Sequence, residues 1–306
     1  MCATLRPEAA QKLSAAACVR WKEPGDELLG LARVAHALVD RDECRPCDIC
    51  LAVPNRNWAQ QMKRACDAAK LASTVCVAPV RISNEAHEAL AALDAAALQS
   101  QEASEAYAKF GHTAEEVAAL AKKCAPLHGF TLVKVLGIDR IHDFAHALYH
   151  VAGTEDAAEL AALLRERLAH PAIPAHVDVT PILDYCTVAA AGEFARVFVV
   201  SCVDGLVPGP AAFEAADAAR REAALDASRA GFEGALLASK GDAVVSYFEK
   251  IDAPIAQAAH IRHARCKMEH GRKLAMCAPC AFLAEAGALR PTTVGGQTFL
   301  RDFNLN

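Results

Sequence analysis

Two cysteine pairs have the spacing of zinc ligands. Cys44 and Cys47 are separated by two residues, as are Cys277 and Cys280. Two such pairs can hold a structural zinc ion between four thiolates. The pairs lie about 230 residues apart in the chain, and the sequence leaves open whether they meet. We expect reduced, unpaired thiols here, because scattered cysteines in a reducing compartment serve mainly as small core residues.

Three histidines, His142, His146 and His150, recur at every fourth residue. On a helix this spacing places them on one face. Adjacent pairs have the spacing of metal ligands, but the outer two would lie about 12 Å apart along the helix axis, too far to share one ion. We interpret them as a polar stripe on a helix and expect no metal site.

The densest group of cationic side chains lies in the last fifty residues. Its members are Arg262, Arg265, Lys267, Arg272 and Lys273. The chain is acidic overall, with a formal net charge of −5, so any attraction for nucleic-acid phosphates must come from a local cluster. We expect these five residues to carry the contact if the chain binds single-stranded DNA. The alternative is a solvated charged helix.

Composition points to a helix-rich chain of about two domains. Apolar residues make up 54% of the 306 residues, yet only 6% are aromatic, which favours helices with small side chains in their contacts. No segment approaches the run of about 18 apolar residues that spans a membrane, and the start of the chain lacks a signal-peptide core. We expect a cytoplasmic protein.

The stretch from Gly192 to Pro208 organises the rest of the chain. Its centre, residues 197–203, is an apolar run rich in β-branched residues, which predicts a strand buried on both faces in the middle of a parallel sheet. The turn residues Asp204 and Gly205 follow it. Because ligands collect at the carboxyl ends of such strands, this turn marks the edge of the sheet to search.

The remaining segments predict an α/β fold, with a mostly parallel sheet flanked by helices and interrupted by an all-helical insertion. Strands are expected at 15–19, 48–53, 74–78, 176–180, 185–188 and 243–247. Helices are expected at 28–39, at 58–69, and at 211–239 with a break at Gly231. The expected domains are 15–80 with 176–250 for the sheet, 81–175 for the insertion, and 251–306 for a basic, mostly helical C-terminal tail.

Together these segments resemble the second motor domain of UvrD/Rep-type superfamily 1 DNA helicases, and their layout resembles AddB/RecC-like subunits. The likeness covers most of the chain, and its motifs are degenerate. Asp26-Glu27-Leu28 before the strand at 48–53, Gly192-Glu193-Phe194, the turn Gly205 to Pro208, and Pro279 to Leu283 are similar to segments of that family. The resemblance implies a RecA-like domain of the P-loop NTPase type, with ATP binding, DNA binding and a role in DNA repair.

The chain departs from the family at the residues that do chemistry. The family's Leu-Thr-Arg-Ala aligns with residues 236–239, so Ala238 stands where an arginine would reach the ATP phosphates. Such an arginine is worth about 10³ to 10⁵ in turnover. Glu193 and Lys240 remain as vestigial nucleotide-binding residues, and no Gly-x-x-x-x-Gly-Lys-Ser/Thr cradle occurs. We expect no ATP hydrolysis by this chain alone, and ATP with Mg²⁺ only alongside a first motor domain.

Three functions follow as alternatives. The first is a degenerate helicase domain that binds single-stranded DNA or a partner, such as a helicase or nuclease subunit. The second is a fragment of an active ATP-dependent DNA helicase or helicase-nuclease whose first motor domain is absent from this chain. The third is a small-molecule enzyme on a doubly wound α/β sheet. Against it stands the lack of a nucleophile elbow, a glycine-rich fingerprint or paired carboxylates at strand ends.

Overall fold

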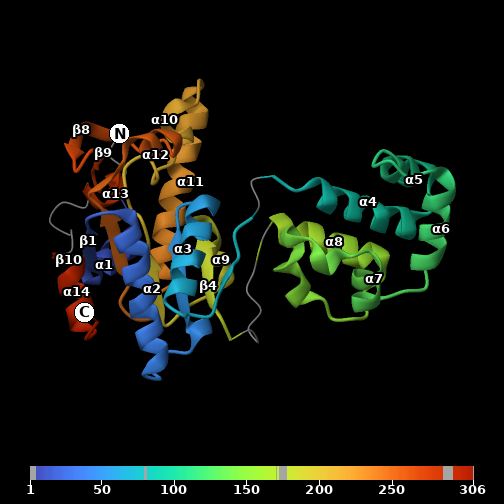
Figure 1. Ribbon diagram of the computed structural model, residues 1–306, viewed down its shortest axis with the longest axis horizontal. Coiled ribbons are helices and arrows are strands. Elements are labelled where there is room, and N and C mark those ends of the chain that lie inside the picture. Colours follow the sequence, from blue (N-terminus) through green and yellow to red (C-terminus); the bar gives the residue numbers. More distant parts are fainter. Residues whose placement is uncertain (1–4, 79–80, 170, 172–177, 285–291, 306) are drawn as a thin grey trace. The chain divides into compact units, whose positions relative to one another are not determined.

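The computed structural model describes residues 5–78, 81–169, 171, 178–284 and 292–305. The chain divides into two compact units, one made of residues 1–77 and 175–306 and the other of residues 78–174. The first unit is built around a parallel sheet, whereas the described residues of the second form helices and turns (Figure 1).

A seven-stranded, all-parallel sheet forms the framework of the first unit. The strand order is β10-β1-β6-β5-β2-β4-β3, which places β5 in the middle as the sequence predicts. This confirms the α/β fold with a mostly parallel sheet and is consistent with a RecA-like domain. The strands are β1 (Ala17–Trp21), β2 (Ile49–Val53), β3 (Ser73–Val75), β4 (Thr180–Asp184), β5 (Arg196–Val199), β6 (Val244–Phe248) and β10 (Thr293–Gly295).

Helices cover both faces of this sheet (Figure 1). Along the strand order, the connections from β1 to β2 and from β2 to β3 run toward the outer strand β3, whereas those from β4 to β5 and from β5 to β6 run toward the outer strand β10. Because parallel crossovers are right-handed, the two sets of helices lie on opposite faces. One face carries α2 (Pro24–Asp40), α3 (Arg56–Ala68) and α14 (Gly296–Asp302), and the other carries α1 (Pro7–Ala15), α9 (Tyr185–Ala191) and α11 (Ala218–Leu237).

The second unit has an apolar core of its own, with Leu93, Leu132, Phe144, Leu160 and Leu164 fully buried in it. Ser83, Ser100 and Thr113 each accept a backbone hydrogen bond at the start of a helix, as N-cap residues do. The helices are α4 (Asn84–Leu98), α5 (Gln101–Ala108), α6 (Ala114–Cys124), α7 (Gly129–Val135) and α8 (Ala157–Ala169), with 3₁₀ turns η2 (Ile138–Arg140), η3 (His142–Phe144) and η4 (Ala147–His150).

Three local expectations are wrong. His142, His146 and His150 do not share one helix, because η3 and η4 are separate 3₁₀ turns. The segment expected as a strand at 185–188 is helix α9, which Asp184 caps by accepting a hydrogen bond from the Thr187 N–H at 2.9 Å. Gly231 does not interrupt α11. A Cβ at Gly231 would lie 3.1 Å from the Cys186 sulfur, so glycine permits the close packing of α11 on α9.

Two expected strands differ in extent from those observed. Of the strand expected at 176–180, residues 176 and 177 lie outside the described residues, residues 178 and 179 are not in a strand, and β4 begins at Thr180. The central strand is shorter than the predicted run, since β5 ends at Val199 and Ser201 adopts a left-handed backbone with φ of 59°.

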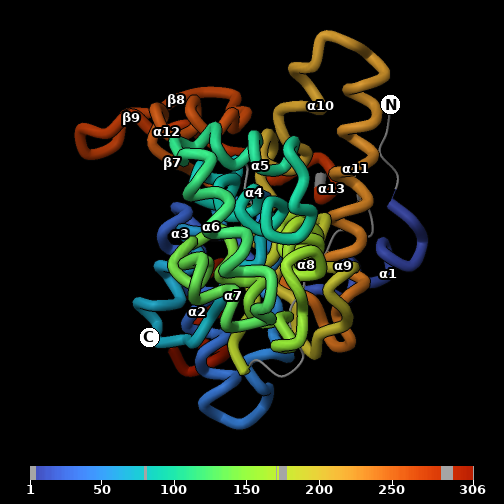
Figure 2. Tube along the Cα trace, turned by 90° about the vertical axis from the view of Figure 1, so that its right-hand side faces the viewer, coloured from blue at the N-terminus to red at the C-terminus, as the bar shows by residue number. Residues whose placement is uncertain are grey.

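The C-terminal stretch is not the mostly helical tail expected from sequence. It belongs to the first unit, adds strand β10 to the main sheet, and forms a second, antiparallel sheet of order β7-β9-β8. His270 and Gly271, at φ of 49° and 78°, make a two-residue turn between β8 and β9. The elements of the C-terminal stretch before β10 are β7 (Lys250–Asp252), α12 (Ala253–Ala258), β8 (His263–Glu269), β9 (Arg272–Cys277) and α13 (Ala281–Ala284). Figure 2 shows the β8–β9 hairpin extending outward from the unit.

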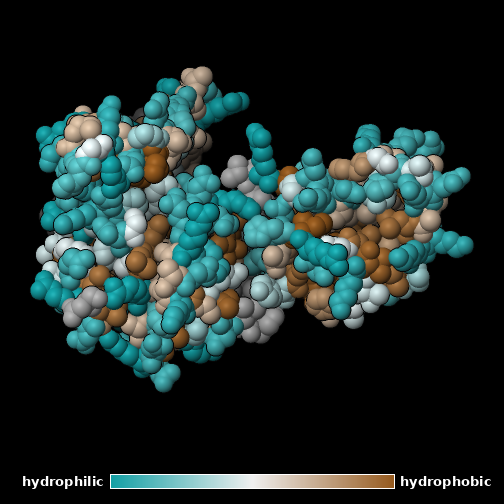
Figure 3. All heavy atoms as spheres, viewed as in Figure 1, coloured by the Kyte–Doolittle hydropathy of each residue, from teal (hydrophilic) through white to brown (hydrophobic). Residues whose placement is uncertain are grey.

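The visible surface is mainly hydrophilic, with apolar side chains gathered over parts of the second unit (Figure 3). Among the described residues of that unit, the exposed large apolar ones are Leu98, Phe110, Phe130 and Tyr149. Among the described residues, no helix has both the length and the apolar composition needed to cross a membrane.

Trp21 controls the packing of α2 and α14 on the sheet. The indole is 3% exposed and lies between two glycines. A Cβ on Gly30 would approach Cη2 of Trp21 to 2.2 Å, and a Cβ on Gly296 would approach Cε3 to 2.2 Å. Both glycines are therefore required by close approach rather than by backbone conformation.

We expect Gly30→Ala to lower the free energy of unfolding by about 1–3 kcal/mol, because the added methyl overpacks the Trp21 contact. Gly25→Ala in the same helix is the matched control, since a Cβ there meets nothing within 4 Å. That control should be neutral or stabilising by up to about 1 kcal/mol. Urea unfolding of the two variants provides the measurement, and equal stability would contradict the packing role of Trp21.

Candidate nucleic-acid interface

The carboxyl edge of the sheet opens between β2 and β5. These neighbouring strands send their connections to opposite faces, and such a point leaves a crevice at the strand ends. A pocket of about 250 Å³ lies there. Asn55, Asn57 and Trp58 line it from the segment after β2, and Gly205 and His260 line it from the opposite side.

A buried carboxylate links the segments beneath the carboxyl ends of the strands. Glu27, in the first turn of α2, is fully buried. It accepts hydrogen bonds from the Ser201 N–H at 2.9 Å, from the Ser201 hydroxyl at 2.6 Å, and from the Ser246 hydroxyl. The Trp58 indole N–H donates to the same Ser201 hydroxyl. This network joins α2, α3, β6 and the segment that leaves β5.

Burial raises the pKa of Glu27 above its ordinary value of 4.5. The hydrogen bonds from Ser201 and Ser246 act in the opposite direction, since they favour the carboxylate. Loss of hydration is the larger effect, so ionising this side chain is harder in the folded protein than in the unfolded chain.

The turn after β5 holds the base of the β8–β9 hairpin. Gly205 has φ of 92°, and a Cβ there would lie 2.5 Å from the His260 carbonyl oxygen and 2.6 Å from the Arg262 nitrogen. The Arg262 N–H also donates to the Asp204 carbonyl at 3.0 Å. The turn that the sequence marks at Asp204 and Gly205 therefore carries the start of the basic segment.

Three of the five predicted DNA-binding cations are engaged within the protein. Arg262 lies 3.7 Å from the Asp204 carboxylate and over the Phe213 ring, 4.4 Å from its centroid. Lys267 pairs with Glu269 at 3.2 Å. Arg272 pairs with Asp252 at 2.9 Å and with Glu23 at 3.2 Å.

The Arg272 pairs fasten the hairpin to neighbouring segments. The two carboxylates raise the pKa of Arg272, and the Arg272 guanidinium holds the pKa of Asp252 below its usual value. Lys250 and Lys267 similarly lower the pKa of Glu269. Arg272 therefore serves the structure of the hairpin more than it serves a ligand.

The cations lie on two faces of the hairpin. Arg265 and Lys267 are two residues apart in β8, so their side chains point to the same face of the strand. They lie opposite Met276 and Leu274 of β9, respectively. Lys273 lies opposite Met268 and belongs to the other face. Arg265, Lys267 and Lys273 are exposed. The five side chains that were expected to act together are therefore separated. Arg262 lies where the hairpin begins, Arg272 is held in ion pairs, and the other three are exposed on the two faces of the hairpin.

At the amino edge of the sheet the structure brings together the two residues that were predicted as vestigial nucleotide-binding groups. The Lys240 ammonium lies 3.5 Å from the Glu193 carboxylate. The Phe194 N–H donates to the Ala238 carbonyl and the Lys240 N–H donates to the Phe194 carbonyl, each at 2.8 Å. Because these segments precede β5 and β6, this edge is opposite the pocket and the hairpin.

The amino edge does not fit the phosphate tail of ATP. Ala238 is a buried methyl where a planar guanidinium would be needed. Lys240 offers a point charge in place of that fork, and its ammonium already faces Glu193. Both side chains of this pair are more than half exposed, so the pair itself adds little stability.

The two CxxC pairs do not meet. Cys44 and Cys47 come before β2, at the amino edge, whereas the Cys280 N–H donates to the Cys202 carbonyl at 2.7 Å, beyond the carboxyl end of β5. A zinc ion shared by the four thiols is thus ruled out by the parallel topology. All four are free thiols.

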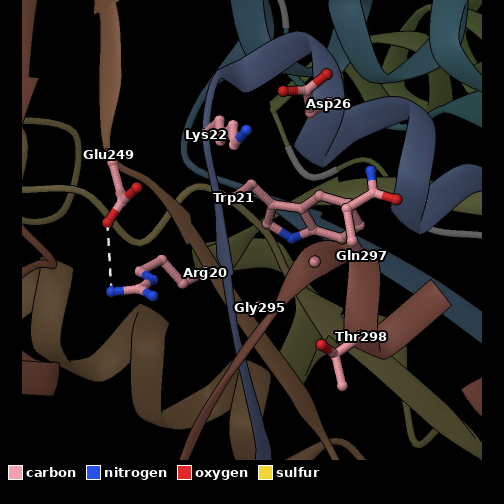
Figure 4. A pocket seen from close by; sticks show the side chains of 9 residues that line it. Arg20, Trp21, Lys22, Asp26, Glu249, Gly295, Gln297 and Thr298 are labelled. Atoms are coloured by element: carbon pink, nitrogen blue, oxygen red, sulfur yellow. Dashed lines mark ion pairs between the residues drawn. The ribbon is translucent and has the colours of Figure 1, made fainter. Parts of the chain in front are cut away.

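A second pocket, of about 410 Å³, lies at the carboxyl ends of β1, β6 and β10. Arg20, Lys22, Asp26 and Glu249 surround it, and Figure 4 shows Arg20 directed toward Glu249. That ion pair measures 3.4 Å. Two cations and two carboxylates give the pocket no preference for one ligand charge.

Sequence reasoning missed Asn55, Asn57, Trp58 and His260 as residues of the carboxyl edge. Asn55 and Asn57 follow a strand end beside Pro54, which is a recognisable signal for a ligand-binding loop. His260 had no comparable signal, because only the fold of the β8–β9 hairpin brings it to the crevice.

Replacing Glu27 tests its buried titration. A folded-state pKa above the unfolded value makes Glu27 contribute stability at low pH and lose that contribution as pH rises through the folded pKa. Relative to Glu27→Gln, the parent should therefore be most favoured at pH values below the ordinary pKa of 4.5 and progressively less favoured as pH rises above it. Urea unfolding of both proteins at several pH values measures this difference. A difference that stays flat with pH, or grows as pH rises, would show that Glu27 is not a raised-pKa group.

Compared with models of known protein families and with curated protein sequences, the chain matches none of them.

Proposed function

We propose that this chain is a UvrD-like second motor domain that has lost ATP hydrolysis and binds single-stranded DNA at the carboxyl edge of its sheet. The observation that carries the proposal is the meeting of two motif-like segments at the amino edge. Gly192-Glu193-Phe194 and residues 236–240 are distant in sequence, yet Phe194, Ala238 and Lys240 are joined by backbone hydrogen bonds. This contact between the two segments supports the proposal, with Ala238 standing where the resemblance implies an arginine.

Support for DNA binding comes from the opposite edge. Arg265 and Lys267 are exposed on one face of β8 and about 6.7 Å apart along the strand, close to the separation of successive phosphates in an extended single strand. Asn55 caps α3 by accepting the Trp58 N–H with its side-chain oxygen, so its NH2 group and the amide of Asn57 are the hydrogen-bonding groups that line the nearby pocket. Phosphate contacts and base contacts can thus be made on one side of the domain.

The pocket gives little support to a small-molecule enzyme. His260 is the one titratable side chain among the described residues that line it, and its Nδ1 lies 2.9 Å from the Glu214 carboxylate. General acid–base chemistry uses positioned titratable groups that reach the substrate.

We keep a cytoplasmic location as part of the proposal.

The purified chain should show no DNA-stimulated ATP hydrolysis, and Ala238→Arg alone should not create it. The reason is that an arginine finger accelerates a nucleotide already held by a phosphate cradle, and the sequence contains no such cradle. Phosphate release with and without single-stranded DNA is the measurement. Turnover that follows the protein peak and disappears in Glu193→Gln would refute the proposal of a silent motor domain.

The double variant Arg265→Ala, Lys267→Ala should bind oligothymidine more weakly and with a flatter salt dependence. Each phosphate contact contributes about −0.7 to the log–log salt slope on single strands, so losing two contacts should reduce the slope by about 1.4. Fluorescence anisotropy at several salt concentrations measures affinity and slope together.

Lys122→Ala, Lys123→Ala is the charge-matched control, because both lysines are exposed on α6 of the second unit. It changes net charge equally and should leave the slope unchanged. An equal effect of the two double variants would show attraction by net charge alone. Failure of the parent chain to bind at low salt would reject DNA binding.

A further inference from the structure

Strand β8 is a free edge of the antiparallel sheet. The strand order β7-β9-β8 leaves one side of β8 unpaired, and residues 263–268 are exposed on both faces of the strand. In the part of the chain that the structure describes, no backbone hydrogen bond reaches this outer side. Exposed edges of this kind are templates for an incoming strand.

The register identifies which backbone groups face outward. The turn at His270 and Gly271 makes Glu269 and Arg272 a hydrogen-bonded pair, and bonded and non-bonded pairs then alternate along the hairpin. Cys266 and Met268 consequently occupy non-hydrogen-bonded positions relative to β9. Their N–H and C=O groups point away from the sheet and are available to another chain.

The side chains of β8 select the chemistry of that chain. One face presents Arg265 and Lys267, and the other presents Cys266 and Met268, with Met268 64% exposed. An added strand would meet cations on one face and an apolar pair on the other. Acidic residues alternating with apolar residues complement both faces at once.

Pairing of β8 with a second copy of itself is disfavoured. Two antiparallel β8 strands paired about Cys266 would place Arg265 opposite Lys267 twice on one face, and like charges on facing strands are destabilising. Glu269 lies on the same face but is already paired with Lys250 and Lys267 within the chain, so it does little to offset this repulsion. The charge pattern therefore favours a different chain.

We propose that the outer edge of β8 binds, by antiparallel strand addition, an extended segment of a partner protein in which acidic and apolar residues alternate. The apolar residues of that segment lie opposite Cys266 and Met268 and exchange backbone hydrogen bonds with them. Its acidic residues lie opposite Arg265 and Lys267 in non-hydrogen-bonded pairs, where side chains are closest. If the proposed DNA contact is correct, such a segment would compete with DNA for these two cations, but strand addition itself does not depend on it.

The probe is a fluorescein-labelled nine-residue peptide of alternating glutamate and valine, titrated with the full chain in an anisotropy assay at low salt. Two matched peptides carry backbone N-methyl groups on either the valines or the glutamates. Methylated valines cannot donate to β8, so that peptide should bind about tenfold or more weakly than the parent peptide. Methylated glutamates point outward and should change binding by less than about twofold.

Two protein variants test the same edge from the other side. Cys266→Pro removes one outward N–H while leaving the β8–β9 hydrogen bonds in place, as proline permits on an edge strand. Cys266→Ser keeps the N–H and is the matched control. The serine variant should bind the unmodified peptide like the parent chain, and the proline variant should lose about tenfold or more in affinity.

The peptide comparison uses unchanged protein, so it remains decisive even if Cys266→Pro disturbs the hairpin. Saturable binding that is lost only with methylated valines supports antiparallel addition to β8. Equal binding of the two methylated peptides, or no saturable binding by the parent chain, overturns the proposal.

Discussion

The buried carboxylate of Glu27 is the constraint on which the carboxyl edge depends. A carboxylate without water is costly, by several kcal/mol per ion when its charge is uncompensated, so its three donors must be held in place. Ser201 supplies two of them, from its N–H and its hydroxyl, and reaches that position in a left-handed backbone. That geometry ends β5 at Val199 and directs the chain into the turn at Gly205. This turn contacts the backbone of His260 and Arg262, where the hairpin begins. The hydrogen bonds of one buried group therefore help to position the start of the basic segment.

Ion pairing decides what the basic segment can offer a ligand. A cation held by two carboxylates, as Arg272 is held by Glu23 and Asp252, must give up those pairs before it can neutralise a phosphate. Lys267 is exposed and faces one carboxylate, that of the half-buried Glu269, which also pairs with Lys250. An ion pair with an exposed cation adds little stability. Lys267 can therefore exchange Glu269 for a phosphate at little cost. The available charge for a polyanion is consequently concentrated on the Arg265 and Lys267 face of β8, not distributed over all five cations.

Much of the sheet could be predicted from the sequence, because buried parallel strands such as β2 and β6 are continuous apolar runs with few competing interpretations. The helix at Tyr185 could not, since its short apolar pattern also suits a strand and the deciding contact is the Asp184 cap. The β8–β9 hairpin could not be predicted for a different reason. Its charged and apolar residues alternate with period two, yet β8 is exposed on both faces, so burial supplies no signal to separate a strand from a charged helix. Of the site, the turn at Gly205 could be located from the sequence, whereas the strand order was needed to show that Glu193 and Lys240 lie together at the opposite end of the strands.

If the chain is the silent motor domain that we propose, its amino edge explains how the fold persists without motor chemistry. The contacts that hold its two segments together run through the backbone, from Phe194 N–H to the Ala238 carbonyl and from Lys240 N–H to the Phe194 carbonyl. Backbone bonds of this kind do not depend on which side chain stands at position 238, and a buried alanine satisfies the site without any polar group to desolvate. An alanine at position 238 is compatible with the parallel pairing of β5 with β6. The carboxyl edge has no such independence, because its loops are positioned by side chains, Glu27, Ser201 and Trp58, and by a glycine that tolerates no Cβ.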